Sequence, residues 1–149
     1  MKNINRILKN KNGFSLVEIL IVMTLVALGG SFVVGQLFAR LEEGKIQSAK
    51  IQISAFKQQL EDYRRYCNQY PTTTQGLEAL MQKPTAAPDC PSYPASGFIG
   101  NTSKLPKDPW DHDYNYEQLD NQKYRITSYG SDSKEGGEKG AADIKSDEL

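Results

Sequence analysis

The sequence predicts an α+β chain in which one long N-terminal helix packs on a small antiparallel sheet. Three observations support this prediction. An almost wholly apolar segment runs from Phe14 to Ala39, an apolar stripe at helical spacing continues beyond it, and two alternating segments within residues 114–127 are typical of a hairpin. The other segments are rich in Pro, Gly, Ser and Asp, which predicts loops.

Residues 1–13 form a short basic leader with four Lys or Arg residues and no acid. Positive charge before an apolar segment holds the N-terminus in the cytoplasm, so we expect the rest of the chain outside it, in the periplasm. The segment 14–39 would measure about 39 Å as a helix, which exceeds the roughly 30 Å hydrocarbon core of a bilayer. A simple membrane anchor does not need this surplus.

The charge balance argues against a nucleic-acid partner. The whole chain has 18 Lys and Arg residues against 18 Asp and Glu residues. Once the four basic residues of the leader are set aside, 14 basic residues face 18 acidic ones, a formal side-chain charge of −4. A mildly acidic body does not attract a phosphate backbone.

The helical pattern continues from the apolar segment into residues 40–66. Apolar residues recur there at spacings of three and four, with polar residues on the opposite side. We interpret residues 14–66 as one helix whose first part meets lipid or partner helices and whose second part covers its own domain. A coiled-coil dimer is the alternative, although three heptads are short for it. The stripe consists of Ile46, Ala49, Ile53, Phe56, Leu60, Tyr63 and Cys67.

Beyond the long helix the sequence predicts a short helix, a long loop and a hairpin. Pro71 marks the end of the first helix, and the threonines after it are suited to cap a second helix that Pro84 stops. The predicted segments are a short helix over 72–83, a loop over 84–113, a hairpin over 114–127 and a loop with a tail over 128–149.

Glu18 is the only charged residue between Phe14 and Ala39. Burying a carboxylate in a membrane segment costs about 2.5–3.5 kcal/mol on insertion scales, so we expect a partner for it. Cleavage after Gly13 would supply one, because the new α-amino group of Phe14 is positive at neutral pH. In a staggered fibre, Glu18 of one subunit would pair with this amine of its neighbour. The alternative is a glutamate whose carboxylate reaches the cytoplasmic edge of the membrane.

These residues resemble a known family. A basic leader that ends in Gly13, followed by Phe14, an apolar stretch and Glu18 at the fifth mature position, resembles a type IV prepilin or pseudopilin. The resemblance implies that prepilin peptidase cleaves between Gly13 and Phe14 and methylates the nitrogen of Phe14. Three further segments resemble the major pseudopilins of type II secretion, which implies a type IV pilin-like fold. They are YPTTTQGLEAL at 70–80, LPKDPW at 105–110 and YRITSYGSD at 124–132.

The resemblance implies a structural subunit and not an enzyme. Such subunits would stand in the bacterial inner membrane, polymerise through helix 14–39 into a periplasmic pseudopilus, and drive the export of folded proteins across the outer membrane. The expected partners are further copies of the chain, minor pseudopilins, the inner-membrane assembly platform and prepilin peptidase. A type IV pilus pilin for adhesion or motility is one alternative, and a membrane-anchored periplasmic binding module that never polymerises is another.

The resemblance also implies one calcium ion in the C-terminal loop. The positions that match the family's ligands are the carboxylates of Asp132 and Asp143 and the backbone carbonyl of Tyr129. Calcium takes six to eight oxygens at about 2.3–2.6 Å, and a glycine-rich backbone is able to turn its carbonyls towards an ion. The alternative is a solvated acidic tail without a metal.

Two cysteines in an oxidising compartment favour a disulfide between Cys67 and Cys90. This bond would tie the end of the long helix to the long loop and contribute about 3 kcal/mol in the loop-entropy model. Both cysteines depart from the family's pattern. A zinc site would need four ligands, and His112 is the only histidine. We interpret His112 as a solvated turn residue and Trp110 as a core anchor for its loop.

Overall fold

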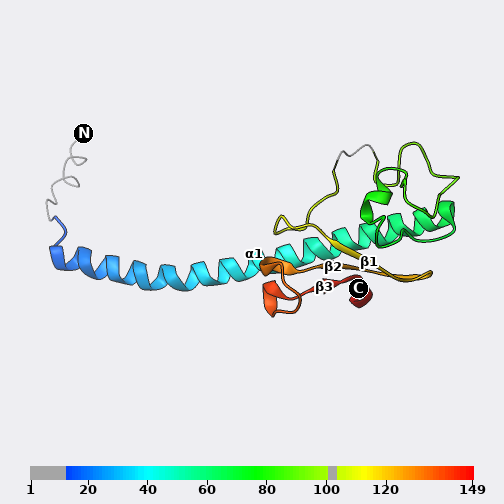
Figure 1. Cartoon of the computed structure of the whole chain (residues 1–149). Helices are drawn as coiled ribbons and strands as arrows, with labels where there is room; N and C mark the ends of the chain where they lie inside the picture. The colour runs from blue at the N-terminus through cyan, green and yellow to red at the C-terminus, as the bar shows by residue number, and fades with distance from the viewer. Residues whose placement is uncertain (1–12, 101–103) are drawn as a thin grey trace, which may run out of the picture. The chain divides into compact units, whose positions relative to one another are not determined.

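The computed structural model describes residues 13–100 and 104–149, and for residues 31–33 it describes the backbone alone (Figure 1). Except for Gly13, the predicted leader lies outside the described residues. The chain divides into two units, Met1–Arg40 and Leu41–Leu149. The helix and strands are α1 (Leu16–Cys67), β1 (Asn115–Asp120), β2 (Lys123–Ser128) and β3 (Ile144–Lys145).

The first unit contains the apolar beginning of α1. Ser15 caps the helix, because its Oγ accepts a hydrogen bond from the Val17 N–H at 3.3 Å and satisfies one of the free donors of a helix start. Large apolar side chains in this unit are exposed, as for Leu16 at 88 %. One 18-residue window of α1 has a mean hydropathy of 2.3 and none of it is buried, so its length and composition are sufficient to cross a membrane.

The core of the second unit forms on the inner face of α1. Side chains three and four residues apart share one face of a helix, and on this face Ile53 and Leu60 are 0 % exposed. From Ala49 onward the predicted stripe is therefore buried within its own domain, with Ile46 partly buried beside it, and it does not form the seam of a coiled coil. The rest of the core comes from the sheet and loops, namely Tyr70, Leu77, Ala79, Leu80, Cys90, Tyr116, Ile126 and Ile144.

Three antiparallel strands form one sheet in the order β1–β2–β3 (Figure 1). Strands β1 and β2 are the predicted hairpin, in which Tyr116 lies opposite Ile126. Both of these side chains are buried while Glu117 is exposed, which is the period-two alternation of a strand. The two-residue strand β3 pairs Ile144 with Ser128. The prediction of loop and tail alone over 128–149 was therefore wrong, because this pairing depends on the end of β2.

The prediction of a helix over 72–83 was also wrong. Only Leu77–Leu80 form a single 3-10 turn. Gly76 has a φ of 62°, in the left-handed region, which an α-helix cannot include. Thr72 closes a turn before that point, since its Oγ1 accepts a hydrogen bond from the Gln75 N–H at 3.2 Å. The leucines are nevertheless buried, so the apolar pattern placed them on the correct side.

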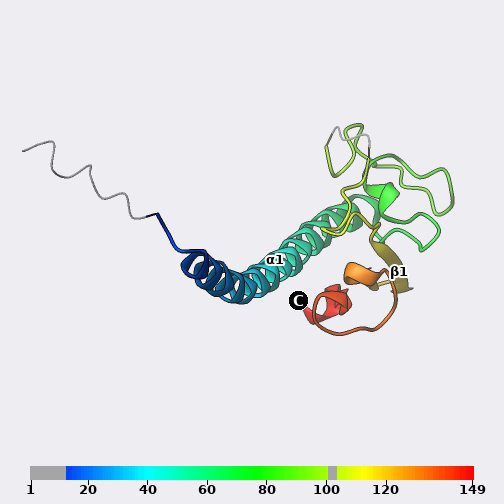
Figure 2. The ribbon, with the colours of Figure 1, turned by 90° about the vertical axis from the view of Figure 1, so that its left-hand side faces the viewer.

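The predicted loop over 84–113 contains no helix or strand among its described residues. A disulfide joins Cys67 to Cys90 and ties this loop to the end of α1, as the sequence predicts. In both views, residues 71–100 and the C-terminal segment 128–149 lie on opposite sides of the later part of α1 (Figures 1 and 2). The helix is thus covered on two sides by its own domain.

Candidate assembly and metal sites

Gly13 and Phe14 precede α1 in an exposed, non-helical stretch. A side chain added at Gly13 would meet no described atom within 4 Å. The Phe14 side chain is 78 % exposed. Proteases need accessible backbone outside regular secondary structure, and the predicted cleavage point has both properties.

Glu18 lies in the first turn of α1, where the helix dipole favours negative charge. Val22 lies four residues after Glu18 on the same helix face, and Phe14 lies four residues before Glu18, just ahead of the helix. Together with Ile19 and Met23, these three residues line an apolar hollow of about 180 Å³. The apolar segment contains no basic side chain, so a side chain of that segment cannot supply a cation for Glu18.

The two ends of the C-terminal loop meet at glycines. Gly130 has a φ of 62°, and a side chain there would collide with the backbone of Gly140 and Ala141. Gly137, with a φ of 85°, approaches Ala141 in the same way. Only glycine adopts these angles at no steric cost, so glycine at both positions allows the two ends of the loop to approach each other closely.

Asp143 places a carboxylate inside this closed loop. Its side chain is 7 % exposed, and its Oδ1 accepts a hydrogen bond from the Gly136 N–H at 3.1 Å. Its Oδ2 is buried and accepts no hydrogen bond from the described residues. The Lys145 ammonium lies 3.4 Å from that oxygen. A buried carboxylate oxygen without a donor is costly unless a cation compensates it, so this atom suits a metal ligand.

Asp132 and Tyr129 lie at the other end of the loop. Asp132 is exposed, and its Oδ1 accepts a hydrogen bond from the Lys134 N–H at 3.1 Å. Tyr129 directly precedes the 3-10 turn that contains Asp132. Within residues 13–100 and 104–149, no three His, Cys, Asp or Glu side chains are placed together to hold a metal ion. An ion bound by Asp143 would therefore need main-chain carbonyls, such as that of Tyr129, among its ligands.

Asp108, which the sequence marked only as part of the LPKDPW segment, fixes the neighbouring loop. Its side chain is 0 % exposed, and Oδ1 accepts hydrogen bonds from the N–H groups of Trp110 at 3.0 Å and His112 at 2.8 Å. Oδ2 accepts the hydroxyl of Ser128, at the end of β2, at 2.6 Å. An aspartate followed by Pro109 is a turn signal, and this signal was available in the sequence.

His112 and Trp110 connect this loop to its surroundings. His112 is more than a solvated turn residue, because its Nδ1 lies 3.1 Å from the carbonyl oxygen of Gly130. The Trp110 indole donates a hydrogen bond to Glu42 on α1 at 2.9 Å, so Trp110 anchors its loop. A side chain on Gly140 would collide with the Glu42 carboxylate. The helix, this loop and the C-terminal loop thus meet around Glu42.

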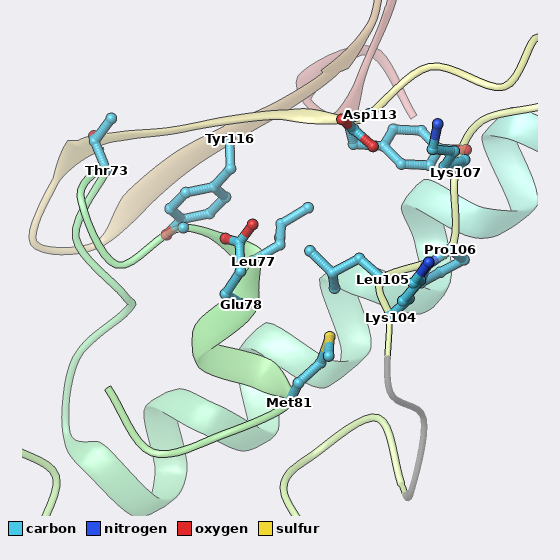
Figure 3. Close-up of a pocket in the computed structure, with 12 residues that line it drawn as sticks. Thr73, Leu77, Glu78, Met81, Lys104, Leu105, Pro106, Lys107, Asp113 and Tyr116 are labelled. Carbon is cyan, nitrogen blue, oxygen red and sulfur yellow. The ribbon is translucent and has the colours of Figure 1, made fainter. Parts of the chain in front are cut away.

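A hollow of about 520 Å³ lies between the turn that carries Leu77 and the beginning of β1 (Figure 3). Its walls include Leu77 and Tyr116, and its charged residues include Glu78 and Asp113. Figure 3 shows Glu78 on the turn that carries Leu77 and Asp113 on the segment that leads into β1, so the two acids come from different parts of the chain.

Comparisons with known proteins agree on one family. The family described as type II secretion system (T2SS), protein G matches residues 36–147, and the prokaryotic N-terminal methylation motif matches residues 8–34. The type II secretion system core protein G of Vibrio cholerae serotype O1 is 38 % identical over 138 residues, which is 92 % of each chain. The protein of that name from Aeromonas hydrophila is 40 % identical over 106 residues, 71 % of this chain and 72 % of that one.

A solved structure is also similar to this chain. The crystal structure of the major pseudopilin from the type 2 secretion system of enterohaemorrhagic Escherichia coli superposes with a TM-score of 0.64. It is 32 % identical and covers 76 % of this chain and 95 % of its own. This similarity confirms the pilin-like fold, and the family consists of structural subunits and not of enzymes. The chain therefore belongs to the type II secretion system protein G family.

Proposed function

We propose that the chain is a structural subunit that polymerises into the periplasmic pseudopilus of the type II secretion system and so drives the export of folded proteins. The first unit carries this proposal, because its large apolar side chains are exposed. Lipid of the inner membrane would cover them before assembly, and the same helices of neighbouring copies would cover them in the fibre. The second unit would stand in the periplasm. Minor pseudopilins and the inner-membrane assembly platform are the further partners that the family relationship supports.

Processing would precede assembly. Prepilin peptidase would remove residues 1–13 by cleavage between Gly13 and Phe14, and would methylate the new nitrogen. The match of residues 8–34 to the N-terminal methylation motif and the exposed backbone at the junction support this step. Methylation of an amine keeps its positive charge, so the processed N-terminus would remain a cation.

The Phe14 amine and the Glu18 carboxylate would then set the register of the fibre. Lipid is as apolar as the helix, so a helix that leaves lipid for a bundle gains little hydrophobic free energy. The pairing of opposite charges in apolar surroundings does lower the free energy, because each charge is costly there when it is alone. A neighbour's Phe14 amine would neutralise Glu18 at one axial offset between subunits, which selects that offset.

Glu18→Leu tests the assembly proposal. The variant should enter the membrane, but its yield of fibres in cells that overproduce the subunit should fall by about tenfold or more, because every contact between subunits leaves the amine without its partner. Glu18→Asp keeps the charge and should retain part of the yield. Val17→Leu, at the neighbouring position, should assemble like the unaltered chain.

Fibres of Glu18→Leu at the unaltered yield would contradict this role of the carboxylate. A processed chain that forms no fibres under any condition would favour the anchored binding module instead. The two outcomes are separated by electron microscopy of fibres together with the mass of the extracted subunit.

We also propose that the loop after β2 binds one calcium ion through the carboxylates of Asp132 and Asp143 and the carbonyl of Tyr129. The buried Oδ2 of Asp143, which accepts no hydrogen bond within the described residues, supports this proposal. When bound, the ion would supply positive charge that links the two ends of the loop. Such a link would offset the entropy of ordering a segment with little apolar core.

Thermal unfolding with calcium or with a chelator tests the metal proposal. The melting temperature of the unaltered protein should fall when the chelator replaces calcium, because only the folded loop binds the ion. Asp143→Asn should remove this difference, whereas Glu135→Gln, an acidic position of the same loop without an assigned role, should keep it. Equal melting temperatures of the unaltered protein under both conditions would contradict the calcium site.

A further inference from the structure

Lys145 holds its ammonium beside the proposed metal ligand. Its Nζ lies 3.4 Å from the Oδ2 of Asp143, the buried oxygen that accepts no hydrogen bond from the described residues. The carboxylate is 7 % exposed and the Lys145 side chain is 32 % exposed, so the pair lies at the edge of the domain. The oxygen that suits a metal ion is therefore the oxygen that this ammonium faces.

The sheet fixes one partner of this contact. Lys145 belongs to β3, where it pairs with Thr127 of β2. Asp143 directly precedes β3 and is the last residue of the loop, two positions before Lys145. The ion pair therefore joins a residue whose backbone the sheet holds to the end of the C-terminal loop.

The side chains around Asp143 disfavour the approach of a divalent cation to the place that the Lys145 ammonium occupies. The hollow of about 200 Å³ beside this pair is lined by three lysines, Lys50, Lys139 and Lys145, and by two acids, Asp143 and Glu148. A divalent cation that approaches Asp143 therefore meets three ammonium groups beside that carboxylate. Charges that share a partly buried site are weakly screened by salt, so these ammonium groups act directly on a bound ion.

We propose that Lys145 is a built-in competitor of the metal: its ammonium holds Asp143 while the site lacks an ion and has to move away when calcium binds. This inference rests on the proposed calcium site. It assigns Lys145 two opposite effects, since the same contact stabilises the metal-free loop and weakens calcium binding. Glu148 lines the same hollow and offers a carboxylate to the displaced ammonium.

Lys145→Met tests the inference, because it keeps the apolar stem and removes the charge. In the full-length processed protein in detergent, the variant should melt at a lower temperature than the unaltered protein when a chelator is present. In calcium titrations followed by the fluorescence of Trp110, the only tryptophan, its calcium dissociation constant should fall by about tenfold. Lys145→Arg keeps the charge and should restore the weaker binding.

Lys50→Met is the matched control, because Lys50 lines the same hollow without an ion pair to Asp143 in the described structure. Its calcium dissociation constant should change by less than about twofold, as expected for a charge at longer range. An equal tightening in Lys50→Met and Lys145→Met would overturn the specific role of Lys145 and leave only general electrostatics. The competition is also overturned if Lys145→Met binds calcium no more tightly than the unaltered protein.

These outcomes separate the inference from the calcium proposal. If the unaltered protein binds calcium and Lys145→Met does not bind it more tightly, the competition is refuted and the calcium site stands. If neither protein responds to calcium, the calcium site is refuted and the competition with it. If only Lys145→Met binds calcium, the competition is supported in its strongest form.

Discussion

Helix α1 exposes its apolar side chains in its first part and buries them in its second. Leu16 is 88 % exposed, whereas Ile53 and Leu60, further along the same helix, are 0 % exposed. The backbone conformation is the same in both parts, so the difference lies in whether the chain supplies a partner surface. The second part meets the sheet and loops of its own domain. Extended exposed apolar surface elsewhere marks a contact with lipid or another protein, which is the role proposed for the first part.

This difference teaches that stability and assembly belong to separate parts of one helix. Changes between residues 41 and 149 should alter the unfolding of the domain, because its core and its disulfide lie there. Changes between residues 14 and 40 should alter membrane insertion and assembly and leave unfolding of the domain unchanged. The predictions below test whether this separation holds.

Alkaline unfolding of the second unit has the largest expected effect. All eight tyrosines lie after residue 40. Burial and the Glu61 carboxylate raise the pKa of Tyr70 to about 12, and burial beside Tyr63 raises the pKa of Tyr93 to about 12. An unfolded tyrosine ionises near pH 10, so the stability that these buried phenols contribute is complete below about pH 10 and is lost as the pH rises towards 12.

Circular dichroism and the absorbance of tyrosinate measure this loss during a titration with base. The two signals should change together, because ionisation of the buried phenols accompanies unfolding. Ionisation of all eight tyrosines near pH 10 in a domain that keeps its folded spectrum would contradict the burial of Tyr70 and Tyr93. The apolar part of α1 contains no tyrosine and should keep its helical signal in detergent throughout.

Leu60→Ala and Ile51→Ala compare two faces of the same helix. Leu60 is 0 % exposed, so its truncation should lower the free energy of unfolding by about 2–5 kcal/mol. Ile51 is 61 % exposed, and the same truncation there should change it by less than about 0.5 kcal/mol. Denaturant titrations provide both values, and equal losses would show that the inner face has been assigned wrongly.

Removal of the disulfide should have an effect of similar size or slightly smaller. The double variant Cys67→Ser with Cys90→Ser should lose about 3 kcal/mol of unfolding free energy, since the bond closes a loop in the unfolded chain. A reductant should destabilise the unaltered domain in the same way and leave the double variant unaffected. An unaltered domain that is insensitive to full reduction would contradict a structural role for this bond.

Gly140→Ala and Gly44→Ala compare a crowded glycine with an open one. A side chain at Gly140 would displace the Glu42 carboxylate and break its hydrogen bond with the Trp110 indole, at an expected cost of about 1 kcal/mol. Gly44 lies in α1 with open space around it, so alanine there should stabilise the helix by about 0.5–1 kcal/mol. Tryptophan fluorescence should change in the first variant only, and the opposite pattern would contradict the contact around Glu42.

The long helix and the hairpin could be predicted from the sequence because their signals are local. The helix predicted over 14–66 is observed as Leu16–Cys67, since spacings of three and four recur along it whatever covers each part. The hairpin predicted over 114–127 is observed as β1 and β2, since alternation fixes which side chains face the core. Cys67 and Cys90 were paired correctly because no other cysteine is present.

The remaining features depend on contacts between distant segments and could not be read locally. Strand β3 has two residues, too few to show a period, and exists because it pairs with the end of β2. The turn at Leu77–Leu80 replaced a predicted helix because Gly76 adopts a positive φ. The contacts of Lys145 with Asp143 and of Glu42 with Trp110 join residues whose proximity only the folded chain establishes.

Zero-length carbodiimide cross-linking of assembled fibres tests the pairing of Glu18 with the Phe14 amine most directly, because this reagent joins a carboxylate only to an adjacent amine. Fibres grown from a mixture of isotopically labelled and unlabelled subunits distinguish links between chains from links within one chain. The account predicts a cross-linked peptide in which the Phe14 nitrogen of one subunit is joined to the Glu18 carboxyl of another. The account would be contradicted if the fibres contain no such peptide and the Phe14 amine still reacts with reagents in the solvent. It would also be contradicted if the chains in the fibres begin at another residue.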